Sequence, residues 1–500
     1  MVLPGLQHIP SPSTGEGEGG GEGRWSTYAT LLPPPSQPSP ARGEGIKQLF
    51  RISSVDMSRT IQQLREDSRH IFAAGGAAVD PVAAVRRAVV RQGDTLYVDG
   101  VPYDLQRYAH VYVVGAGKAG ATMAQGLEEV LGERLTGGVV TVKYGHLAPV
   151  SRVTIHEAAH PVPDAAGMRA AEALRHLAQQ AGVDDVVFCL LSGGGSALLP
   201  APSPGITLAE KQQVTSLLLE CGASIDEINT IRKHLSQLKG GQLARLVLPA
   251  TLITLVLSDV VGDRLDVIAS GPTVPDPTTY QDCLEILRSY DLLTRLPVSV
   301  RTHLQRGQAG ELAETPKATD PAFACCQTVI IGSNRLALQA AGAAAQARGY
   351  TTLLLSSSLE GETRHIARMH AAIAREIRQT EAPLVPPACV LTGGETTVTI
   401  RGDGLRGRNQ EFTLAVALDI AGLDGVVVLS GGTDGTDGPT PAAGALADGS
   451  TVARARALRL APETCLRRND SYHFFHALDD LLITGPTGTN VMDMHILLVG

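Results

Sequence analysis

Short apolar runs, each followed by a glycine-rich loop and then by a helical segment, recur along this chain and constrain its fold more than any other feature. The apolar run His110–Val114 precedes the loop Gly115–Gly120 and a helical stretch at Ala121–Leu131, and Gly138–Lys143 has the pattern of the next strand. A strand, a crossover helix and a second strand in this order form a parallel βαβ unit. We therefore expect an α/β fold built on a doubly wound parallel sheet.

The alternation continues along the rest of the chain. Further strands are expected at Asp185–Leu191 and Ala250–Leu257, and a second series of elements begins after the polar stretch Gln305–Asp320. For this second series the pattern predicts strands at Thr328–Ile331, Thr351–Ser356, Cys389–Thr392, Gly425–Leu429 and His495–Val499, a hairpin at Thr396–Ile400, and helices at Asn334–Arg348, Glu362–Gln379 and Gln410–Ala421.

Five hundred residues are too many for one ordinary hydrophobic core, so we expect two domains. The N-terminal domain, Rossmann-like, is expected over residues 57–315 and a smaller α/β domain over residues 316–500, with the active site in the cleft between them. Residues 1–56 are dominated by Gly, Pro, Ser and Glu. They are predicted to form a disordered tail, and we interpret Met57 as the start of the working protein.

Charge and cysteine usage exclude several classes of function. The 42 Lys and Arg against 50 Asp and Glu give a formal net charge of -8, which argues against a general affinity for nucleic acid or for anionic membranes. No apolar run reaches the roughly 18 residues that a membrane span needs. The seven cysteines form no C-x-x-C pair, and the N-terminus lacks an export signal, so we expect reduced thiols in a cytoplasmic protein.

The loop Gly115–Gly120 has G-x-G-x-x-G spacing, in which Gly115 and Gly117 let backbone amides approach an anion at a helix N-terminus. A dinucleotide site also requires an acidic residue about 20 positions further on to bind the ribose hydroxyls. At that position this chain has Thr141–Tyr144, which contains no carboxylate. Lys118 places a cation where a phosphate or carboxylate would bind. The alternative is a tight turn with a solvated lysine.

The second glycine loop follows another apolar run. In Ser192–Ser196, three glycines between two serines present a row of N–H donors that suits a phosphate chain, although a flexible loop without a ligand would have the same composition. A third run ends with two carboxylates, Asp259 and Asp263, and either could position Mg²⁺ or accept a hydroxyl proton.

The second half of the chain places charged residues in similar loops. Glu395 lies in a glycine turn after an apolar run, and Arg408 precedes a helical segment. Arginine binds carboxylate or phosphate at two points. In the glycine loop Ser430–Pro439 we favour Asp434 as a functional residue and interpret Asp437 as part of a surface turn.

Two histidines, His160 and His234, could act as bases. Neither lies beside a nucleophile in the sequence. For both we favour ordinary packing or a polar contact.

Seven short motifs, in the same order along the chain, resemble class II glycerate kinases. The last three resemble the MOFRL-type C-terminal domain of that family, and the resemblance covers about Met57 to Gly500. The motifs are Val114–Ala119, His160–Asp164, Leu191–Ser196, Gly393–Val398, Arg408–Glu411, Gly432–Pro439 and Thr484–Val491.

The resemblance implies ATP-dependent phosphorylation of D-glycerate to 2-phosphoglycerate with Mg²⁺. It implies that Lys118 and Arg408 are catalytic cations and that Asp259, Glu395 and Asp434 line the cleft, with Asp259 and Asp434 as metal ligands. It places ATP at glycine-loop and helix-start residues, namely Gly115, Gly117, Ser192, Gly193, Gly194, Gly195, Ser196 and Asn409. A homodimer is left open.

Two other functions are consistent with parts of the pattern. The G-x-G-x-x-G spacing would suit a nicotinamide-dependent hydroxypyruvate reductase, but the missing acid and Lys118 oppose it. A non-catalytic sensor of sugar acids would keep the cleft without turnover, and the assembled Lys, Arg, Glu and Asp residues argue against it.

Overall fold

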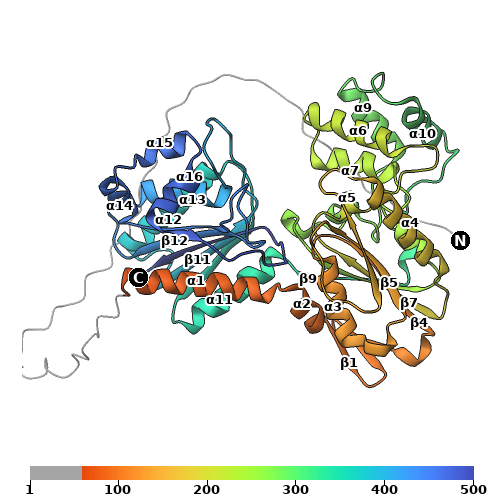
Figure 1. Ribbon diagram of the computed structural model, residues 1–500, viewed down its shortest axis with the longest axis horizontal. Helices are drawn as coiled ribbons and strands as arrows, with labels where there is room; N and C mark the ends of the chain where they lie inside the picture. The colour runs from red at the N-terminus through yellow and green to blue at the C-terminus, as the bar shows by residue number, and fades with distance from the viewer. Residues whose placement is uncertain (1–58) are drawn as a thin grey trace, which may run out of the picture. The chain divides into compact units, whose positions relative to one another are not determined.

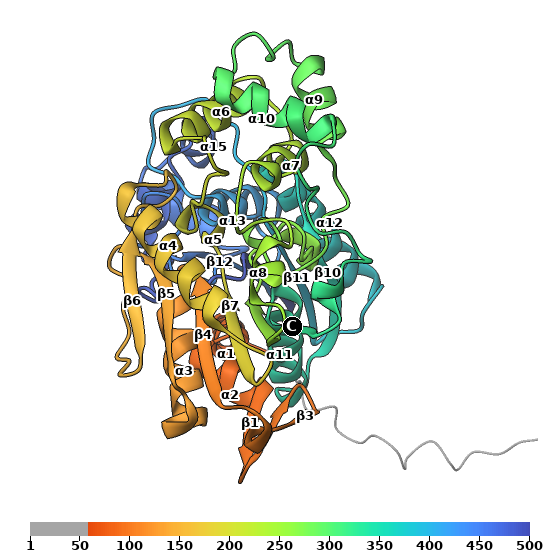
Figure 2. The same ribbon diagram turned by 90° about the vertical axis from the view of Figure 1, so that its right-hand side faces the viewer.

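The computed structural model describes residues 59–500, so the predictions for residues 1–56 and for the start at Met57 lie outside the described part. Six parallel strands form the first sheet, in the order β6-β5-β4-β7-β8-β9. Figure 2 shows β6, β5, β4 and β7 side by side in that order. This is the strand order of doubly wound sheets, and the predicted α/β class is confirmed. The strands are β4 (His110–Ala116), β5 (Gly137–Lys143), β6 (Val153–Ala158), β7 (Asp185–Leu191), β8 (Thr251–Leu257) and β9 (Cys326–Gly332).

Strand β7 lies at the centre of this sheet and is buried at every position. A parallel sheet covered by helices on both faces needs such continuous apolar strands, because neither face meets water. Helix α3 (Gly120–Leu131) contacts β4, β5 and β7, and helix α4 (Ala165–Gln180) contacts β4, β5 and β6. The sequence starts α4 with an Asp164 side chain that accepts a hydrogen bond from the amide of Gly167.

The second sheet is mixed and has the order β10-β11-β15-β12-β13-β14. Strands β10 and β11 are parallel, and β15 inserts antiparallel between β11 and β12. The C-terminal strand therefore begins beside the ends of two other strands, a placement that matters for the site. The strands are β10 (Thr351–Leu359), β11 (Ala388–Gly394), β12 (Val426–Gly432), β13 (Gly444–Asp448), β14 (Leu481–Leu482) and β15 (Asp493–Val499).

The first described helix, α1 (Ile61–Ala78), belongs with the second sheet although it begins the described chain. It contacts α11 (Asn334–Ala347), β12 and β15, and Figure 1 shows α1 beside α11. Helix α2 (Pro81–Ala88) follows at once and contacts α3 and β9. One continuous cluster of buried side chains includes residues of both sheets.

The remaining helices complete the layers. Their bounds are α5 (Gly195–Leu198), α6 (Leu208–Glu220), α7 (Ile225–His234), α8 (Gln242–Val247), α9 (Tyr280–Ser289), α10 (Val298–Gln308), α12 (Thr363–Thr380), α13 (Arg408–Asp419), α14 (Thr451–Ala457), α15 (Pro462–Arg467) and α16 (Ser471–Leu478). Among them, α6, α7, α9 and α10 enclose a separate small core made mostly of Leu, Ile and Val side chains. Before β4, strands β1 (Val89–Gln92), β2 (Thr95–Val98) and β3 (Val101–Asp104) form a small antiparallel sheet.

The sequence predictions are wrong or incomplete for several elements. Strand β9, expected to open the second series, pairs with β8 in the first sheet, and β6 was not expected because its residues Val153–Ala158 mix polar and apolar types. The hairpin predicted at Thr396–Ile400 is absent from the structure, where Thr397 forms only an isolated bridge with Glu362. The predicted domain limits at residues 57–315 and 316–500 stay a prediction.

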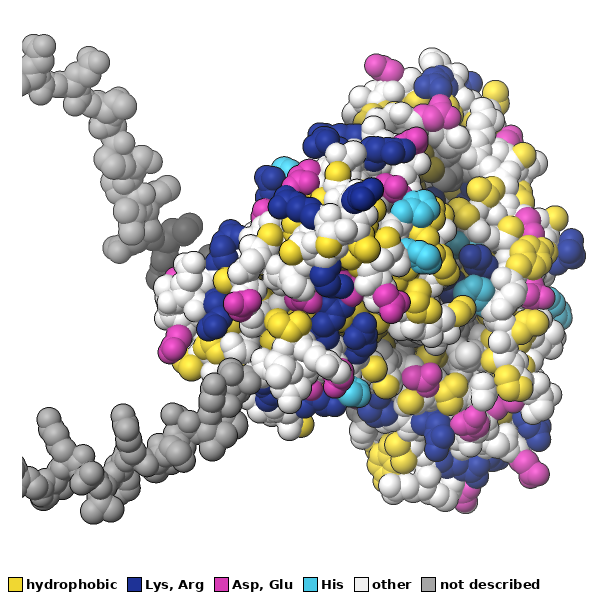
Figure 3. Space-filling view, turned by 60° about the vertical axis from the view of Figure 1, so that its left-hand side comes forward, with side chains coloured by type: hydrophobic (Ala, Val, Ile, Leu, Met, Phe, Trp, Pro, Cys, Tyr) yellow, Lys and Arg dark blue, Asp and Glu magenta, His cyan; other side chains and the backbone are white. Residues whose placement is uncertain are grey.

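Charged side chains of both signs are interspersed over the face drawn in Figure 3. Within residues 59–500, none of the helices combines the length and the apolar character that a membrane crossing needs.

Candidate active site

The carboxyl ends of β4 and β7 meet at the point where the strand order reverses, which is where open α/β sheets bind ligands. The amide of Lys118 donates to the carbonyl of Gly193 at 2.8 Å, and the amide of Ala119 donates to Oγ of Ser192 at 3.0 Å. Gly117 has a φ of 143° and lies so close to Ser192 that a Cβ would come within 2.1 Å of Oγ. The two glycine loops are therefore held in one fixed arrangement, and it includes Lys118.

Asp259 follows β8 and lies directly beside this pair of loops. A Cβ on Gly193 would fall 2.1 Å from Oδ2 of Asp259, so only glycine permits the approach. Burial raises the pKa of Asp259 to about 6, Lys118 opposes the rise, and Glu395 adds to it. The carboxylate is thus ionised at neutral pH, and it lies close enough to Lys118 and Glu395 for both charges to change its pKa.

His160 borders the same loop. Its Nε2 would lie 3.1 Å from a Cβ on Gly194. Burial, and to a lesser extent the charge of Lys118, lowers the pKa of His160 to about 4, so the ring is neutral at physiological pH. His234, in contrast, is a buried polar contact, because Nδ1 meets the carbonyl of Thr230 at 2.8 Å and Nε2 meets Glu314 at 3.1 Å.

In the second sheet, Arg408 is the first residue of α13 and is held by two carboxylates. Its Nη1 lies 2.7 Å from Oε1 of Glu395, and its Nε and Nη2 lie 2.5 and 3.1 Å from the two oxygens of Asp493. Burial alone would lower the pKa of Arg408, but these ion pairs outweigh it and raise the pKa. The guanidinium is therefore a fixed positive charge that remains about one-third exposed.

Asp493 was missed by sequence reasoning. It begins β15 and pairs with Gly394 of β11 on one side and Gly432 of β12 on the other. Burial raises the pKa of Asp493, whereas Arg408 and Asn409 lower it by hydrogen bonding to the carboxylate. The sequence did contain one signal for Asp493, namely its place next to the apolar run at the end of the chain. An acidic side chain that is buried in such a place needs a partner.

The prediction that Asp437 is part of a surface turn is wrong, because this residue is only 2% exposed. Its two carboxylate oxygens accept hydrogen bonds from the amides of Asn409 and Gln410, at 3.1 and 2.8 Å. These amides belong to the first turn of α13 and have no partner within the helix. Burial raises the pKa of Asp437 to about 7. Asp437 therefore fixes the start of the helix that carries Arg408.

Asp434 lies one residue beyond Thr433 in the same loop and is partly exposed. Its Oδ1 accepts hydrogen bonds from the amide and the hydroxyl of Thr436, at 3.0 and 3.1 Å. Within residues 59–500, no three His, Cys, Asp or Glu side chains are grouped so as to hold a metal ion.

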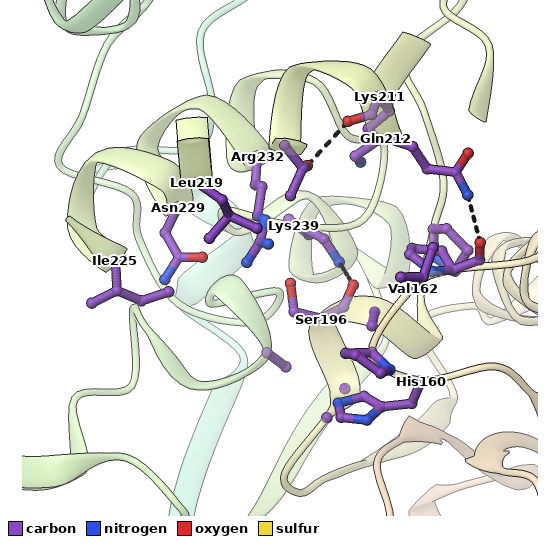
Figure 4. Close-up of a pocket in the computed structure, with 18 of the residues that line it drawn as sticks. His160, Val162, Ser196, Lys211, Gln212, Leu219, Ile225, Asn229, Arg232 and Lys239 are labelled. Carbon is purple, nitrogen blue, oxygen red and sulfur yellow. Dashed lines mark hydrogen bonds between the residues drawn. The ribbon is translucent and has the colours of Figure 1, made fainter. Parts of the chain in front are cut away.

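A pocket of about 870 Å³ opens beside the glycine loop of β7. Its lining includes Gly194, Ser196, His160 and Asp259, so one end of it reaches the first cluster of candidate residues. Figure 4 shows that other parts of its wall come from α6 and α7, which carry Leu219 and Arg232 among others.

The structure thus gathers the predicted residues into two groups. Lys118, Gly193 and Asp259 meet at the first sheet, and Glu395, Arg408 and Asn409 meet at the second. The negative charge of Glu395 raises the pKa of Asp259, so the two groups of residues interact electrostatically.

Comparison with known proteins gives a consistent result. Residues 67–305 match a family model described as a domain of unknown function, DUF4147, and residues 388–493 match the MOFRL family. The chain is 45% identical to a D-glycerate 2-kinase of Thermotoga maritima over 78% of this chain and 90% of the relative. It is 40% identical to a glycerate 2-kinase of Pyrococcus horikoshii, over 87% and 97%.

Two further matches are a relative with a different name and a solved crystal structure. A protein of Agrobacterium vitis named as a hydroxypyruvate reductase is 42% identical over 87% of this chain and 94% of its own length. The crystal structure of a glycerate kinase from Thermotoga maritima is similar, with a TM-score of 0.79 and 40% identity, over 88% of this chain and all of the other.

Proposed function

The chain belongs to the glycerate 2-kinase family, and from that premise we propose that it transfers the γ-phosphoryl group of ATP to the 2-hydroxyl of D-glycerate. The observation that carries the proposal is the meeting of Lys118 and Asp259 at the switch point of the first sheet. A cation and a carboxylate at the end of parallel strands, next to two glycine loops, are the parts that phosphoryl transfer requires.

Lys118 and Arg408 supply the positive charge in this proposal. In phosphoryl transfer the developing charge spreads over the equatorial oxygens, so catalysis depends on placed cations more than on covalent chemistry. Arg408 is fixed by Glu395 and Asp493, which limits the side-chain freedom that is lost when it binds an anion. We assign it to the substrate carboxylate or to the transferred phosphoryl group, both of which a guanidinium binds at two points.

Asp259 is the carboxylate that acts on the hydroxyl side. Its pKa of about 6 leaves it ionised at neutral pH yet basic enough to accept a proton as the hydroxyl oxygen attacks. Ligation of a metal ion is the other use of this placement. Both uses require the ionised form.

Mg²⁺ fits the oxygen donors present. The ion takes one or two carboxylates together with phosphate oxygens, and Asp259 and Asp434 would hold it. No hydrogen bond from another described side chain reaches the carboxylate of Asp259, so its oxygens are open to a hard cation. When bound, Mg²⁺ neutralises charge on the phosphates.

ATP is assigned to the two glycine loops, which are locked together because Oγ of Ser192 accepts a hydrogen bond from the amide of Ala119, and in which Gly194 is partly exposed. The cleft between the two predicted domains is the proposed place of reaction. All seven cysteines lie in the described residues and none is paired, which supports the proposed cytoplasmic location.

The alternative function, a nicotinamide-dependent hydroxypyruvate reductase, has less support. Strand β5 ends at Lys143, and neither its last residues nor the turn Tyr144–His146 includes an Asp or Glu of the kind that holds ribose hydroxyls in dinucleotide sites. The loop after β4 is filled on one side by Ser192 and carries Lys118.

The proposal is tested with Lys118→Ala and Arg408→Ala, assayed for ADP release with D-glycerate, ATP and Mg²⁺. We expect kcat to fall by about 10²-fold or more in each variant, since one placed charge is worth that much in a transition state. Arg288→Ala is the matched control, because Arg288 is an exposed residue of α9. Near-normal turnover of both site variants would overturn the assignment.

A further inference from the structure

Three cationic side chains, Lys211, Arg232 and Lys239, line the large pocket beside the glycine loop of β7. Among the residues that the structure describes, no carboxylate lies within ion-pair distance of any of the three, whereas their neighbour Lys233 pairs with Asp276 at 3.3 Å. The pocket wall therefore holds three cationic side chains and one carboxylate, Asp259, which forms an ion pair with none of them.

The hydrogen bonds that Lys211, Arg232 and Lys239 form within the protein leave some of their N–H donors free. Lys239 is only 2% exposed, and its Nζ donates to the carbonyls of Ser196 at 2.7 Å and Leu199 at 3.1 Å. An ammonium group has three donors, so one remains. Lys211 donates to one carbonyl, and the guanidinium of Arg232 donates to no described residue. In Figure 4 both Arg232 and Lys239 extend toward Ser196.

Unpaired buried charge is costly, and the pKa values reflect it. Burial lowers the pKa of Lys239 well below its usual range, and the charges of Lys211 and Arg232 lower it further. Burial and Arg232 likewise lower the pKa of Lys211 to about 7. A bound anion would offset both effects at once, because it faces all three cations.

The polar neighbours are also donors. The hydroxyl of Ser270 donates to Oδ1 of Asn229 at 3.1 Å and lies 2.8 Å from Oγ of Ser196. The carbonyl oxygen of Asn229 is thereby occupied, which leaves its amide N–H groups for the pocket. The wall around Arg232 is therefore rich in donors and suits an anion.

The size and the other walls of the pocket select the kind of anion. At about 870 Å³ it is far larger than a three-carbon acid needs and lies within the range of about 300–1,000 Å³ found for drug-sized ligands and cofactors. Val162, Leu208, Leu219 and Ile225 provide apolar surface that suits a purine base. Gly194 and Asp259 connect the pocket to the proposed reaction centre.

We propose that this pocket is the nucleotide site, with Arg232 and Lys239 binding the polyphosphate of ATP and Leu219 and Ile225 facing the base. The γ-phosphoryl group then lies toward Gly194 and Lys118. This inference rests on the proposed function and extends it, because it assigns the nucleotide to residues beyond the two glycine loops.

The test is the affinity for ADP, measured by calorimetric titration of the full chain without D-glycerate. Arg232→Gln is expected to weaken ADP binding by about 10- to 100-fold, the value of one charge-assisted hydrogen-bond contact, and Arg232→Lys by less. In turnover assays the KM for ATP rises while the KM for D-glycerate stays near the wild-type value. Arg288→Gln, an exposed arginine outside the pocket, is the control and keeps wild-type affinity.

Unchanged ADP affinity in a folded Arg232→Gln protein, checked by circular dichroism, would overturn the proposal. A raised KM for D-glycerate with unchanged ADP affinity would also overturn it, because the acid would then occupy the cationic wall. ADP binding that depends on Arg232 in a protein that does not phosphorylate D-glycerate would support the pocket and contradict the proposed function.

Discussion

Replacing Gly193 by alanine tests whether the position of the Asp259 carboxylate governs turnover. A Cβ at residue 193 would lie 2.1 Å from Oδ2 and 2.7 Å from Cγ of Asp259. The φ of Gly193 is not in the left-handed region, so alanine meets no backbone strain there. The added methyl group itself is therefore the perturbation, and it acts directly on one carboxylate.

The expected magnitude follows from the distance. A carbon and an oxygen in close contact lie about 3.3–3.6 Å apart, so the carboxylate must retreat by more than about 1 Å. A misplacement of about 1 Å at a reacting group costs about 10²-fold in rate. Overpacking of this kind also lowers the free energy of unfolding by about 1–3 kcal/mol, which a protein of this size tolerates.

The assay is kcat from ADP release at saturating ATP and D-glycerate, together with the melting temperature. Gly76→Ala is the matched control, because Gly76 lies inside α1 and a Cβ there meets no atom within 4 Å. It is expected to keep wild-type kcat and to gain roughly 0.5–1 kcal/mol of stability. A folded Gly193→Ala protein with wild-type kcat would refute the reasoning, since Asp259 would then be displaced without effect.

Three further predictions concern single groups. Lys118→Met should lower kcat by about 10²-fold or more with little change in melting temperature, since the charge is lost while the stem remains; equal losses of activity and folding would contradict a catalytic role. The rate kcat/KM should fall as pH drops through about 6, because Asp259 is active when ionised, and Asp259→Asn should remove that limb from the residual pH profile. Asp437→Asn should lower the free energy of unfolding by about 1–3 kcal/mol in urea titration, because an amide offers only one acceptor to the amides of Asn409 and Gln410; an unchanged midpoint would contradict this.

Four strands of the first sheet, β4, β5, β7 and β8, could be predicted from the sequence because their signals are local. Each of β4, β7 and β8 is a short apolar run that ends in a glycine or acidic loop, so the pattern shows both the strand and the position of its carboxyl end. That edge is where parallel strands bring their loops together, and Lys118 and Gly193 do meet there.

What could not be predicted depends on pairing between distant segments. Nothing local in the sequence shows that β15 inserts between β11 and β12, and this insertion alone brings Asp493 to Arg408. The apolar run of β9 likewise does not show which sheet it joins.

Asp437 illustrates a second limit. Aspartate among glycines is typical of an exposed turn. Here the same residue type caps α13 from a segment more than twenty residues further along the chain, so its burial follows from tertiary contacts. At Thr396–Ile400 the alternating pattern of Thr, Val and Ile favours a strand, but Thr397 and Thr399 instead bond to Gly361 and Glu362.

The most direct test of the central claim is to incubate the purified protein with D-glycerate, ATP and Mg²⁺, follow ADP release, and identify the phosphoglycerate isomer by NMR. The account predicts ADP release that depends on D-glycerate and a product that is 2-phosphoglycerate. Absence of ADP release together with loss of NADH or NADPH on addition of hydroxypyruvate would contradict it, because the glycine loop after β4 would then hold a dinucleotide.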